Sequence, residues 1–324
     1  MSAKKVTSDF DQQTLKTSDA HFDSSSEKSE ESLLEPSRRQ FVLCNQHFNG
    51  NITIFTSEDS ASKYDAFKEL TPDQGNFHNI LELQKQGLGI PLLRVKFHYF
   101  DEKYASVLKY NIPQGNVLFE EKKDNHEICT IRKKLFSSYV RYEFQFDFND
   151  NKRFTVFFFM HYKLPIGDTT PFPNGNSYRW IHSEYHELWL KYSYSLFLLD
   201  EEDLSMTENM DQVSGKLDPK NNLVQGNILN LFKFRSRKVK DNLVPNVKLG
   251  SLNYSKRKSL GSYQRTAKFV LRSLEEARNL GSTLSVNDTD LMFLCISSII
   301  KRHEDKRKKR RYRMRTMAGA GSGS

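Results

Sequence analysis

The feature that most constrains the fold is an apolar stretch near the C-terminus, residues 291–300, with the sequence LMFLCISSII. A helix built from these residues has no polar face, so protein or lipid must surround it on all sides. The stretch is too short to cross a bilayer, which takes about 20 apolar residues. Asp288 or Thr289 is the expected N-cap, and Asp290 lies in the first turn, where the helix dipole favours an acid. We therefore predict a helix that is buried inside the protein.

Aromatic residues are frequent and indicate strands, since the 324 residues include 24 Phe and 14 Tyr. The clearest hairpin spans residues 141–162. Its first strand alternates polar residues with four aromatic ones, Tyr142, Phe144, Phe146 and Phe148. The returning strand, residues 154–160, is apolar on both faces, so both faces must be covered. A closed barrel with the C-terminal helix inside and other elements outside would cover them.

The remaining strands complete the fold prediction. They are expected at residues 41–44, 52–55, 92–100, 106–112, 117–122, 128–135, 177–181, 193–199, 227–234 and 247–254. Their short links favour antiparallel pairing, so the fold class is mainly β with α: an antiparallel barrel of roughly 10–12 strands enclosing a hydrophobic C-terminal helix. Residues 264–280 have helical spacing, although residues 267–271 would also serve as a strand. A short helix is expected at residues 60–70, and residues 164–176 are expected to form a loop.

Composition divides the chain into three parts. Residues 1–38 form an acidic, Ser-rich leader that we expect to be disordered. Residues 39–312 form one barrel domain with an exposed insertion at residues 201–226, and residues 313–324 are a basic end with a linker-like tail. The three cysteines are far apart in apolar runs, and there is no CxxC motif or secretory signal. Buried thiols in a reducing compartment are therefore expected.

With its terminal helix and its Tyr178-Arg179-Trp180 segment, the chain resembles the tubby C-terminal-like superfamily. This group includes tubby proteins, phospholipid scramblases, plant LURP-one-related proteins and poorly characterised fungal relatives. The resemblance rests on a meander of strands, a loop into the aromatic strand, a late strand ending in Leu252, and an apolar helix that starts at Thr289-Asp290-Leu291 and runs into basic residues. It implies a twelve-stranded antiparallel barrel closed around a hydrophobic C-terminal helix. No segment matches a scramblase's acidic calcium motif or its palmitoylated cysteine cluster, and no lipid-site residue of tubby proteins can be carried over.

Sequence motifs give no indication of catalysis. The chain has no GxxxxGK[ST], GxGxxG or GxSxG pattern. Residues 182–187 contain two histidines in an HxExH arrangement, and exposed polar residues are a better interpretation of them than a zinc site. The carboxylate pairs are consecutive, so on a strand they point to opposite faces. We predict a non-enzyme with no catalytic residue, no cofactor and no metal site.

Basic clusters are the best candidates for a functional site. One patch for an anionic ligand is predicted on two neighbouring loops, formed by Lys233, Arg235, Arg237, Lys238, Lys240, Lys256, Arg257 and Lys258. The basic tail after the apolar helix contributes Lys306, Arg307, Lys308, Lys309, Arg310 and Arg311. Possible phosphorylation sites are Ser24, Ser25, Ser26, Ser29 and Ser259. A phosphate on Ser259 would remove positive charge from the patch. Solvated loops and an acidic solubilising leader are the simpler interpretations of these segments.

Two functions remain open. The first is a cytosolic, non-catalytic adaptor that docks through its basic loops on an anionic membrane lipid, such as a phosphoinositide, or on a protein partner. The second is a nuclear or nucleic-acid-associated protein that uses the basic tail as its contact. Within residues 306–311 no Phe or Tyr is interleaved with the basic residues, which argues against a stacking platform for single strands.

Overall fold

The structure is a computed structural model of residues 1–324. It describes residues 38–46, 50–69, 74–98, 102–136, 139–148, 152–162, 166–186, 191–200, 244–260, 263–272 and 286–320. The predicted leader lies outside these residues except for Arg38, and the predicted insertion lies outside them entirely.

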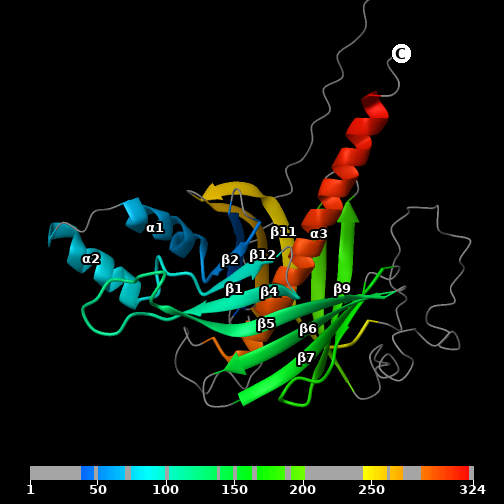
Figure 1. The fold of residues 1–324 in the computed structure, drawn as a ribbon, viewed down its shortest axis with the longest axis horizontal. Helices are drawn as coiled ribbons and strands as arrows, with labels where there is room; N and C mark the ends of the chain where they lie inside the picture. Colours follow the sequence, from blue (N-terminus) through cyan, green and yellow to red (C-terminus); the bar gives the residue numbers. More distant parts are fainter. Residues whose placement is uncertain are drawn as a thin grey trace, which may run out of the picture. The chain divides into compact units, whose positions relative to one another are not determined.

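Twelve antiparallel strands form a closed barrel (Figure 1). They are β1 (Arg38–Gln46), β2 (Ile52–Phe55), β3 (Leu93–Phe97), β4 (Lys103–Tyr110), β5 (Asn125–Leu135), β6 (Tyr139–Phe148), β7 (Lys152–His161), β8 (Ile166–Thr169), β9 (Ser177–His186), β10 (Lys191–Leu199), β11 (Lys248–Leu260) and β12 (Tyr263–Arg272). Strands adjacent in sequence pair with each other, and β1 pairs with both β2 and β12 to close the barrel. The predicted fold class is thereby confirmed.

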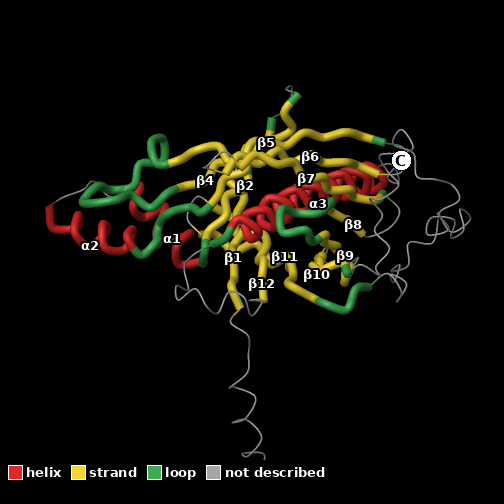
Figure 2. The backbone as a smooth tube through the Cα atoms, turned by 90° about the horizontal axis from the view of Figure 1, so that it is seen from below, coloured by secondary structure: helices red, strands yellow, loops and turns green. Residues whose placement is uncertain are grey.

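Three helices complete the fold: α1 (Glu58–Glu69), α2 (Gln74–Lys85) and α3 (Asp288–Ala320). The first two lie together at one side of the barrel, in the connection between β2 and β3 (Figure 1). The third runs among the strands in both views (Figures 1 and 2), and Figure 1 shows that it continues beyond them. Because α3 is continuous from Asp288 to Ala320, the predicted domain boundary at residue 312 does not interrupt the structure.

The predicted internal helix is confirmed, because every residue from Leu291 to Ile300 is buried and its apolar side chains join the barrel core. The Phe293 ring lies 4.8 Å from the Tyr178 ring and 5.6 Å from the Phe172 ring, measured between centroids. Trp180, two residues after Tyr178, packs on Phe269 of β12, with the two ring centroids 5.5 Å apart. Tyr178 and Trp180 therefore face inward, which explains the aromatic residues in this strand.

The N-terminus of α3 differs in detail from the prediction, because Asn287 caps the helix instead of Asp288 or Thr289. The Asp290 amide donates to Asn287 Oδ1 at 2.8 Å, and the Asn287 amide donates to Asp290 Oδ2 at 3.2 Å. This reciprocal pair is a capping box, which needs a carboxylate three residues after the cap. Arg39 on β1 also donates to both carboxylate oxygens of Asp290, so the helix start is tied to the barrel wall.

Both faces of β7 are covered near Phe159, as its apolar sequence predicts, whereas earlier on the outer face Phe157 is half-buried and Thr155 is exposed. Phe158 points into the barrel core, whereas Phe159 is on the outer side and is also fully buried. Two polar residues continue this outer row across the neighbouring strands. In the register, Phe159 of β7 pairs with Asp168 of β8, and Asp168 pairs with Arg179 of β9. Arg179 donates to both Asp168 oxygens at 2.7 and 2.8 Å, and both side chains are almost completely buried. A buried charge needs such a partner.

At four places the local prediction and the structure differ. Residues 117–122 are an irregular loop instead of a strand, and residues 166–169 form β8 inside a segment predicted as loop. Helix α2 was not predicted. Of the two alternatives for the start of residues 264–280, the strand is the correct one, because Ala267, Phe269 and Leu271 all face the core at a spacing of two. The predicted strand at residues 227–234 lies outside the described residues.

Candidate functional site

Beyond the apolar core, α3 is held by polar contacts at the end of the barrel from which it emerges, which we call the mouth. The buried Lys301 ammonium donates to Asn45 Oδ1 at 2.7 Å and to Asp305 Oδ2 at 2.6 Å. On another side of the helix, Glu304 accepts a hydrogen bond from the Tyr194 hydroxyl and pairs with Arg307. These contacts fix the first two turns of the basic run against the strands.

A third side of α3 carries only cations. Arg302, Lys306 and Arg310 are four residues apart and therefore lie on one face of the helix. Arg302 donates to the Gly50 carbonyl at 3.0 Å, and its guanidinium lies 4.6 Å from the Phe97 ring centroid. Gly50 has a φ of 65°, and a Cβ there would lie 2.5 Å from Arg302 Nη1. Glycine at this position allows the approach of the guanidinium.

Lys133, from the end of β5, completes a group that we call the basic cluster: Lys133, Lys306 and Arg310. The Lys133 and Lys306 ammonium groups lie 5.3 and 5.4 Å from the centroid of the Tyr104 ring. Lys133 also lies 5.9 Å from the Tyr142 ring. All three distances are in the range of cation–π attraction, which contributes about 0.5–1 kcal/mol at exposed sites. The tyrosines thus hold two lysines from separate elements next to each other.

The electrostatics of the basic cluster are unbalanced. Partial burial, then the neighbouring charges of Arg302, Lys133 and Arg310, lower the pKa of Lys306. Partial burial and Arg310 likewise lower the pKa of Lys133. In the part of the chain that the structure describes, none of the three cluster residues forms an ion pair with a carboxylate. Such a cluster favours an anion with several charged oxygens, because each cation can donate to a different oxygen.

The structure brings together only part of the predicted basic tail. Lys306 and Arg310 belong to the basic cluster, whereas Arg307 pairs with Glu304 at 3.3 Å and Lys308 lies 3.1 Å from the Tyr254 ring centroid. Lys309 is exposed, and Arg311 is in the same helix. The aromatic rings missing from the tail sequence are thus supplied by strands, and the chain's own lysines cover them.

The predicted loop patch is not supported in the form expected. Lys256, Arg257 and Lys258 do not follow a strand end, because β11 continues to Leu260 and Lys258 pairs with Arg265 of β12. Ser259 is in the same strand, opposite Gln264. The other members of the patch, residues 233–240, and the four N-terminal candidate phosphorylation sites lie outside the described residues.

Lys133 was missed because its neighbours in sequence do not mark it as special. It belongs to a run of four exposed residues at the end of β5, Arg132 to Leu135. The only available signal was the strand period: Lys133 is two residues after the core residue Ile131 and therefore lies on the inward side, at the rim. A cation at that position of a barrel strand faces the emerging helix.

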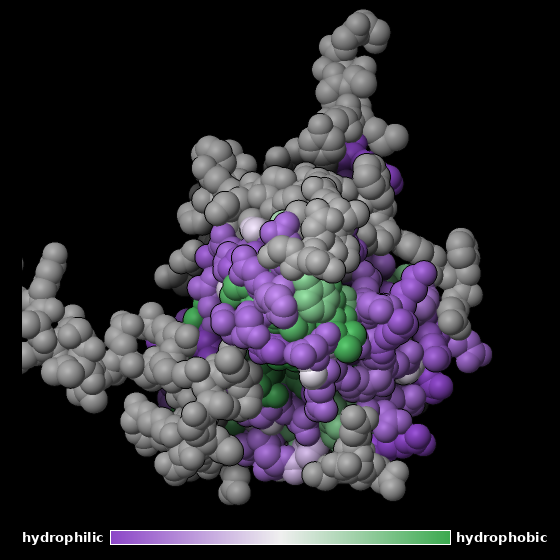
Figure 3. Space-filling view, turned by 90° about the vertical axis from the view of Figure 1, so that its left-hand side faces the viewer, coloured by the Kyte–Doolittle hydropathy of each residue, from purple (hydrophilic) through white to green (hydrophobic). Residues whose placement is uncertain are grey.

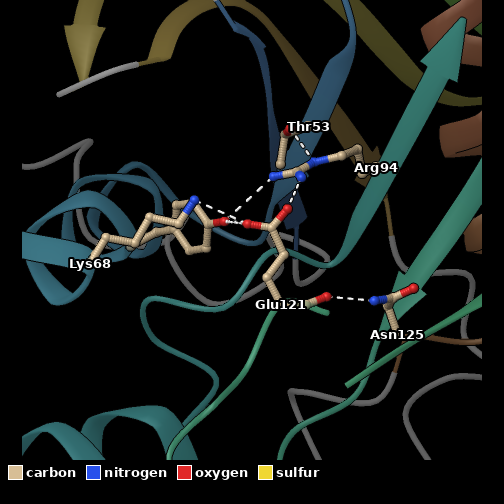
Figure 4. Close-up of polar contacts among 6 residues, drawn as sticks. Thr53, Lys68, Arg94, Glu121 and Asn125 are labelled. Atoms are coloured by element: carbon tan, nitrogen blue, oxygen red, sulfur yellow. Dashed lines mark hydrogen bonds and ion pairs between the residues drawn. The ribbon is translucent and has the colours of Figure 1, made fainter. Parts of the chain in front are cut away.

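A second polar group fixes α1 to the barrel. Glu121, in the loop after β4, accepts hydrogen bonds from the buried Arg94 of β3 and from the Tyr64 hydroxyl of α1, and pairs with Lys68 at 3.0 Å (Figure 4). Arg94 also donates to Thr53 Oγ1 at 3.4 Å. Each charge in this group has an opposite partner, so it resembles a structural clamp more than a ligand site.

A cavity of about 180 Å³ adjoins this clamp. Its lining is mainly apolar and consists of Tyr64, Phe67, Lys68, Ile80, Gln84, Gly89, Leu118, Phe119 and Glu121. The side of the molecule that carries α1 and α2 shows apolar residues ringed by hydrophilic ones (Figure 3). Gln84 accepts a hydrogen bond from the Phe119 amide at 2.9 Å and so joins α2 to the loop.

The described residues contain no group of three or more His, Cys, Asp or Glu side chains placed to hold a metal ion. Of the HxExH segment, His182 lies in β9 with its ring edge-on to the Tyr194 ring, at 4.9 Å between centroids.

All three cysteines are buried, as predicted. No helix among the described residues has the length and apolar character needed to cross a membrane.

Comparison with known proteins gives one match. The family model DIA1 matches residues 35–309, a range that covers the barrel, the buried part of α3 and the cluster residues Lys133 and Lys306. No curated protein and no solved structure matches the chain. The match neither supports nor contradicts the resemblance to tubby-like proteins, which stays a prediction. Because the matched range is most of the sequence, the chain belongs to the DIA1 family.

Proposed function

We propose that this protein is a cytosolic, non-catalytic adaptor that docks through the basic cluster on anionic membrane lipids, such as phosphoinositides. The observation that carries the proposal is the convergence of Lys133, Lys306 and Arg310 on one side of the mouth without a carboxylate partner among the described residues. Like charges held together repel each other. A bound phosphate would relieve this repulsion.

The expected strength is sufficient for reversible docking. A basic residue near an anionic leaflet contributes about 1 kcal/mol, so three contribute about 3 kcal/mol, or roughly a hundredfold in affinity. Stable attachment to a membrane takes a second contribution besides charge. The cluster alone therefore gives a weak, salt-sensitive contact.

The covering of the aromatic rings at the mouth favours lipid over nucleic acid as the ligand. Non-specific binding to single strands uses exposed rings on which bases stack. At the mouth, lysines of the chain itself lie over Tyr104 and Tyr254, and Tyr142 is buried. These three rings support cations that face an anion, and none of the three offers a free face on which a base could stack.

Vesicle flotation tests the proposal. Phosphatidylcholine vesicles with and without a phosphoinositide or phosphatidylserine are mixed with the full chain at low and high salt. We expect flotation only with the anionic lipids, and less at high salt. The variant Lys133→Glu combined with Lys306→Glu should lose at least a hundredfold in affinity, since two attractions become repulsions.

The matched control changes the same net charge elsewhere. Lys309→Glu combined with Lys96→Glu alters two exposed lysines outside the basic cluster, and its affinity should fall much less. Equal losses in the two double variants would show that only net charge matters and would contradict the cluster. Absence of flotation together with salt-steep binding to duplex DNA or RNA would replace this function with the nucleic-acid alternative.

A further inference from the structure

Two apolar side chains project from the mouth beside the basic cluster. Leu135 is 64% exposed and Tyr162 is 49% exposed, so both rank among the most exposed large hydrophobic residues of the described chain. Isolated exposed apolar residues are common on protein surfaces. These two differ because both lie at the rim from which α3 emerges, next to unpaired cations.

The strand register places them at that rim. Leu135 pairs with Val140 at the last position of the β5–β6 ladder, and Val140 pairs with Met160 of β7. Val140 and Met160 point into the core, so Leu135 continues the same inward row past the end of the barrel. Tyr162 follows Met160 by two residues. Its hydroxyl is also close enough to add to the burial effect that raises the pKa of Tyr142.

Strands β5 and β6 supply the neighbouring charges. Lys133 is two residues before Leu135 on the same side of β5, and it pairs with Tyr142. Lys134 and Arg141 lie 5.4 and 5.5 Å from the Phe136 ring centroid. The adjoining ends of β5 and β6 therefore combine a projecting apolar group with cations on both sides of the strand.

We propose that Leu135 and Tyr162 insert into the headgroup–acyl boundary of an anionic bilayer while the basic cluster binds the headgroups. This inference rests on the proposed function, and it identifies apolar insertion as the second contribution, besides charge, that stable attachment to a membrane takes. The occupant follows from the charges: cations flank the apolar pair, and a bilayer with anionic headgroups presents a negative layer over an apolar one. Tyrosine is also a residue that favours the membrane–water interface.

Tryptophan scanning tests the insertion directly. Leu135→Trp and Tyr162→Trp place a fluorophore at each position, and vesicles with brominated acyl chains quench indoles that enter the boundary. We expect a blue shift and at least a twofold loss of emission with anionic brominated vesicles, relative to the unaltered protein under the same conditions. The matched control is Ile112→Trp, which is 48% exposed but follows the opposite end of β4.

A second measurement separates the insertion from the charge contact. Leu135→Ala should lower the partition coefficient by about tenfold, because burial of its side chain is lost, while the salt dependence stays unchanged. Flotation of the unaltered protein with no quenching at either tryptophan would overturn the insertion and leave the proposed function intact. Absence of flotation would overturn both. Quenching of the Ile112→Trp protein to the same extent would show that the mouth is not the inserted surface.

Discussion

The Tyr194 hydroxyl on β10 donates a hydrogen bond to Oε1 of Glu304 on α3 at 2.9 Å, across 110 residues of sequence. Both side chains are buried. Burial alone would raise the pKa of Glu304, but His303, Arg307 and the Tyr194 hydroxyl outweigh it and hold the pKa at about 2. The contact thus couples the charge of one carboxylate to the position of α3 in the barrel.

The pKa of Glu304 predicts a specific loss of stability in acid. A carboxyl group whose pKa is lower in the folded protein stabilises it above its ordinary pKa of 4.5, and this contribution is lost as the pH falls from 4.5 towards 2. Its size is on the order of 3 kcal/mol. Glu304→Gln should therefore reduce the free energy of unfolding at pH 7 and approach the unaltered protein at low pH. Urea unfolding across this pH range measures the difference.

The control for this experiment is Glu82→Gln, which changes an exposed carboxylate that pairs with Lys85. Its difference from the unaltered protein should stay small at every pH. If Glu304→Gln loses stability in acid as steeply as the unaltered protein does, Glu304 is not the group responsible.

The helix inside the barrel predicts a large effect of one core substitution. Phe293→Ala removes the ring that contacts Phe172 and Tyr178, and the cavity left behind should reduce the free energy of unfolding by about 3–5 kcal/mol. Phe293→Asp should prevent folding, because a charge there would have no partner. Denaturant unfolding measures both. Leu135→Ala, at an exposed position, should change stability by less than about 0.5 kcal/mol. A comparable loss in both alanine variants would mean that α3 is not packed inside the barrel.

The sequence was sufficient for the barrel because its strongest patterns are simple. The alternation over residues 141–148 and the two-sided apolar strand after it require a closed sheet with a filled interior, and residues 291–300 are the apolar rod that fills it. Residues 264–272 allowed two predictions, since Ala267 and Leu271 satisfy a helical spacing as well as a strand period. These residues form a strand because hydrogen bonding to β1 on one side and β11 on the other stabilises the extended conformation.

The basic cluster was only half visible from the sequence. A run of cations at residues 306–311 marks a possible contact, but the sequence cannot show which of them face a carboxylate or a ring. Separation into faces requires the helix and its position in the mouth: Arg307 turns towards Glu304, whereas Lys306 turns towards Tyr104. Lys133, about 170 residues earlier, joins the cluster through the barrel closure alone.

The clamp between α1 and the barrel predicts a local effect. Glu121→Gln would leave the buried Arg94 without its carboxylate, and we expect a loss of about 2 kcal/mol, since Glu121 itself is partly exposed. Hydrogen exchange should show faster opening of α1, while α3 keeps its protection. The neighbouring Glu120→Gln affects an exposed pair with Lys123 and should leave α1 unchanged. Uniform loosening of the whole barrel would contradict a local clamp.

The unbalanced charge of the basic cluster predicts that one substitution stabilises the protein and weakens its binding. Lys306→Met keeps a flexible side chain on Tyr104 but removes a charge that burial and three neighbouring cations disfavour. Since the pKa of Lys306 is lowered by folding, its cost is present at neutral pH and decreases as the pH rises towards the ordinary value of 10.5. The gain should be roughly 0.5 kcal/mol at low salt and should diminish at about 1 M salt, where screening is strong.

The same variant should respond differently to a polyanion. Inositol hexakisphosphate at low salt should raise the melting temperature of the unaltered protein, because it binds the folded form and relieves the repulsion. It should raise that of Lys306→Met much less. Lys309→Met, on a different face of the same helix, removes an equal charge and should retain the full response. If Lys306→Met lowers stability at low salt, or if both methionine variants lose the response equally, Lys133, Lys306 and Arg310 do not act as one anion-binding site.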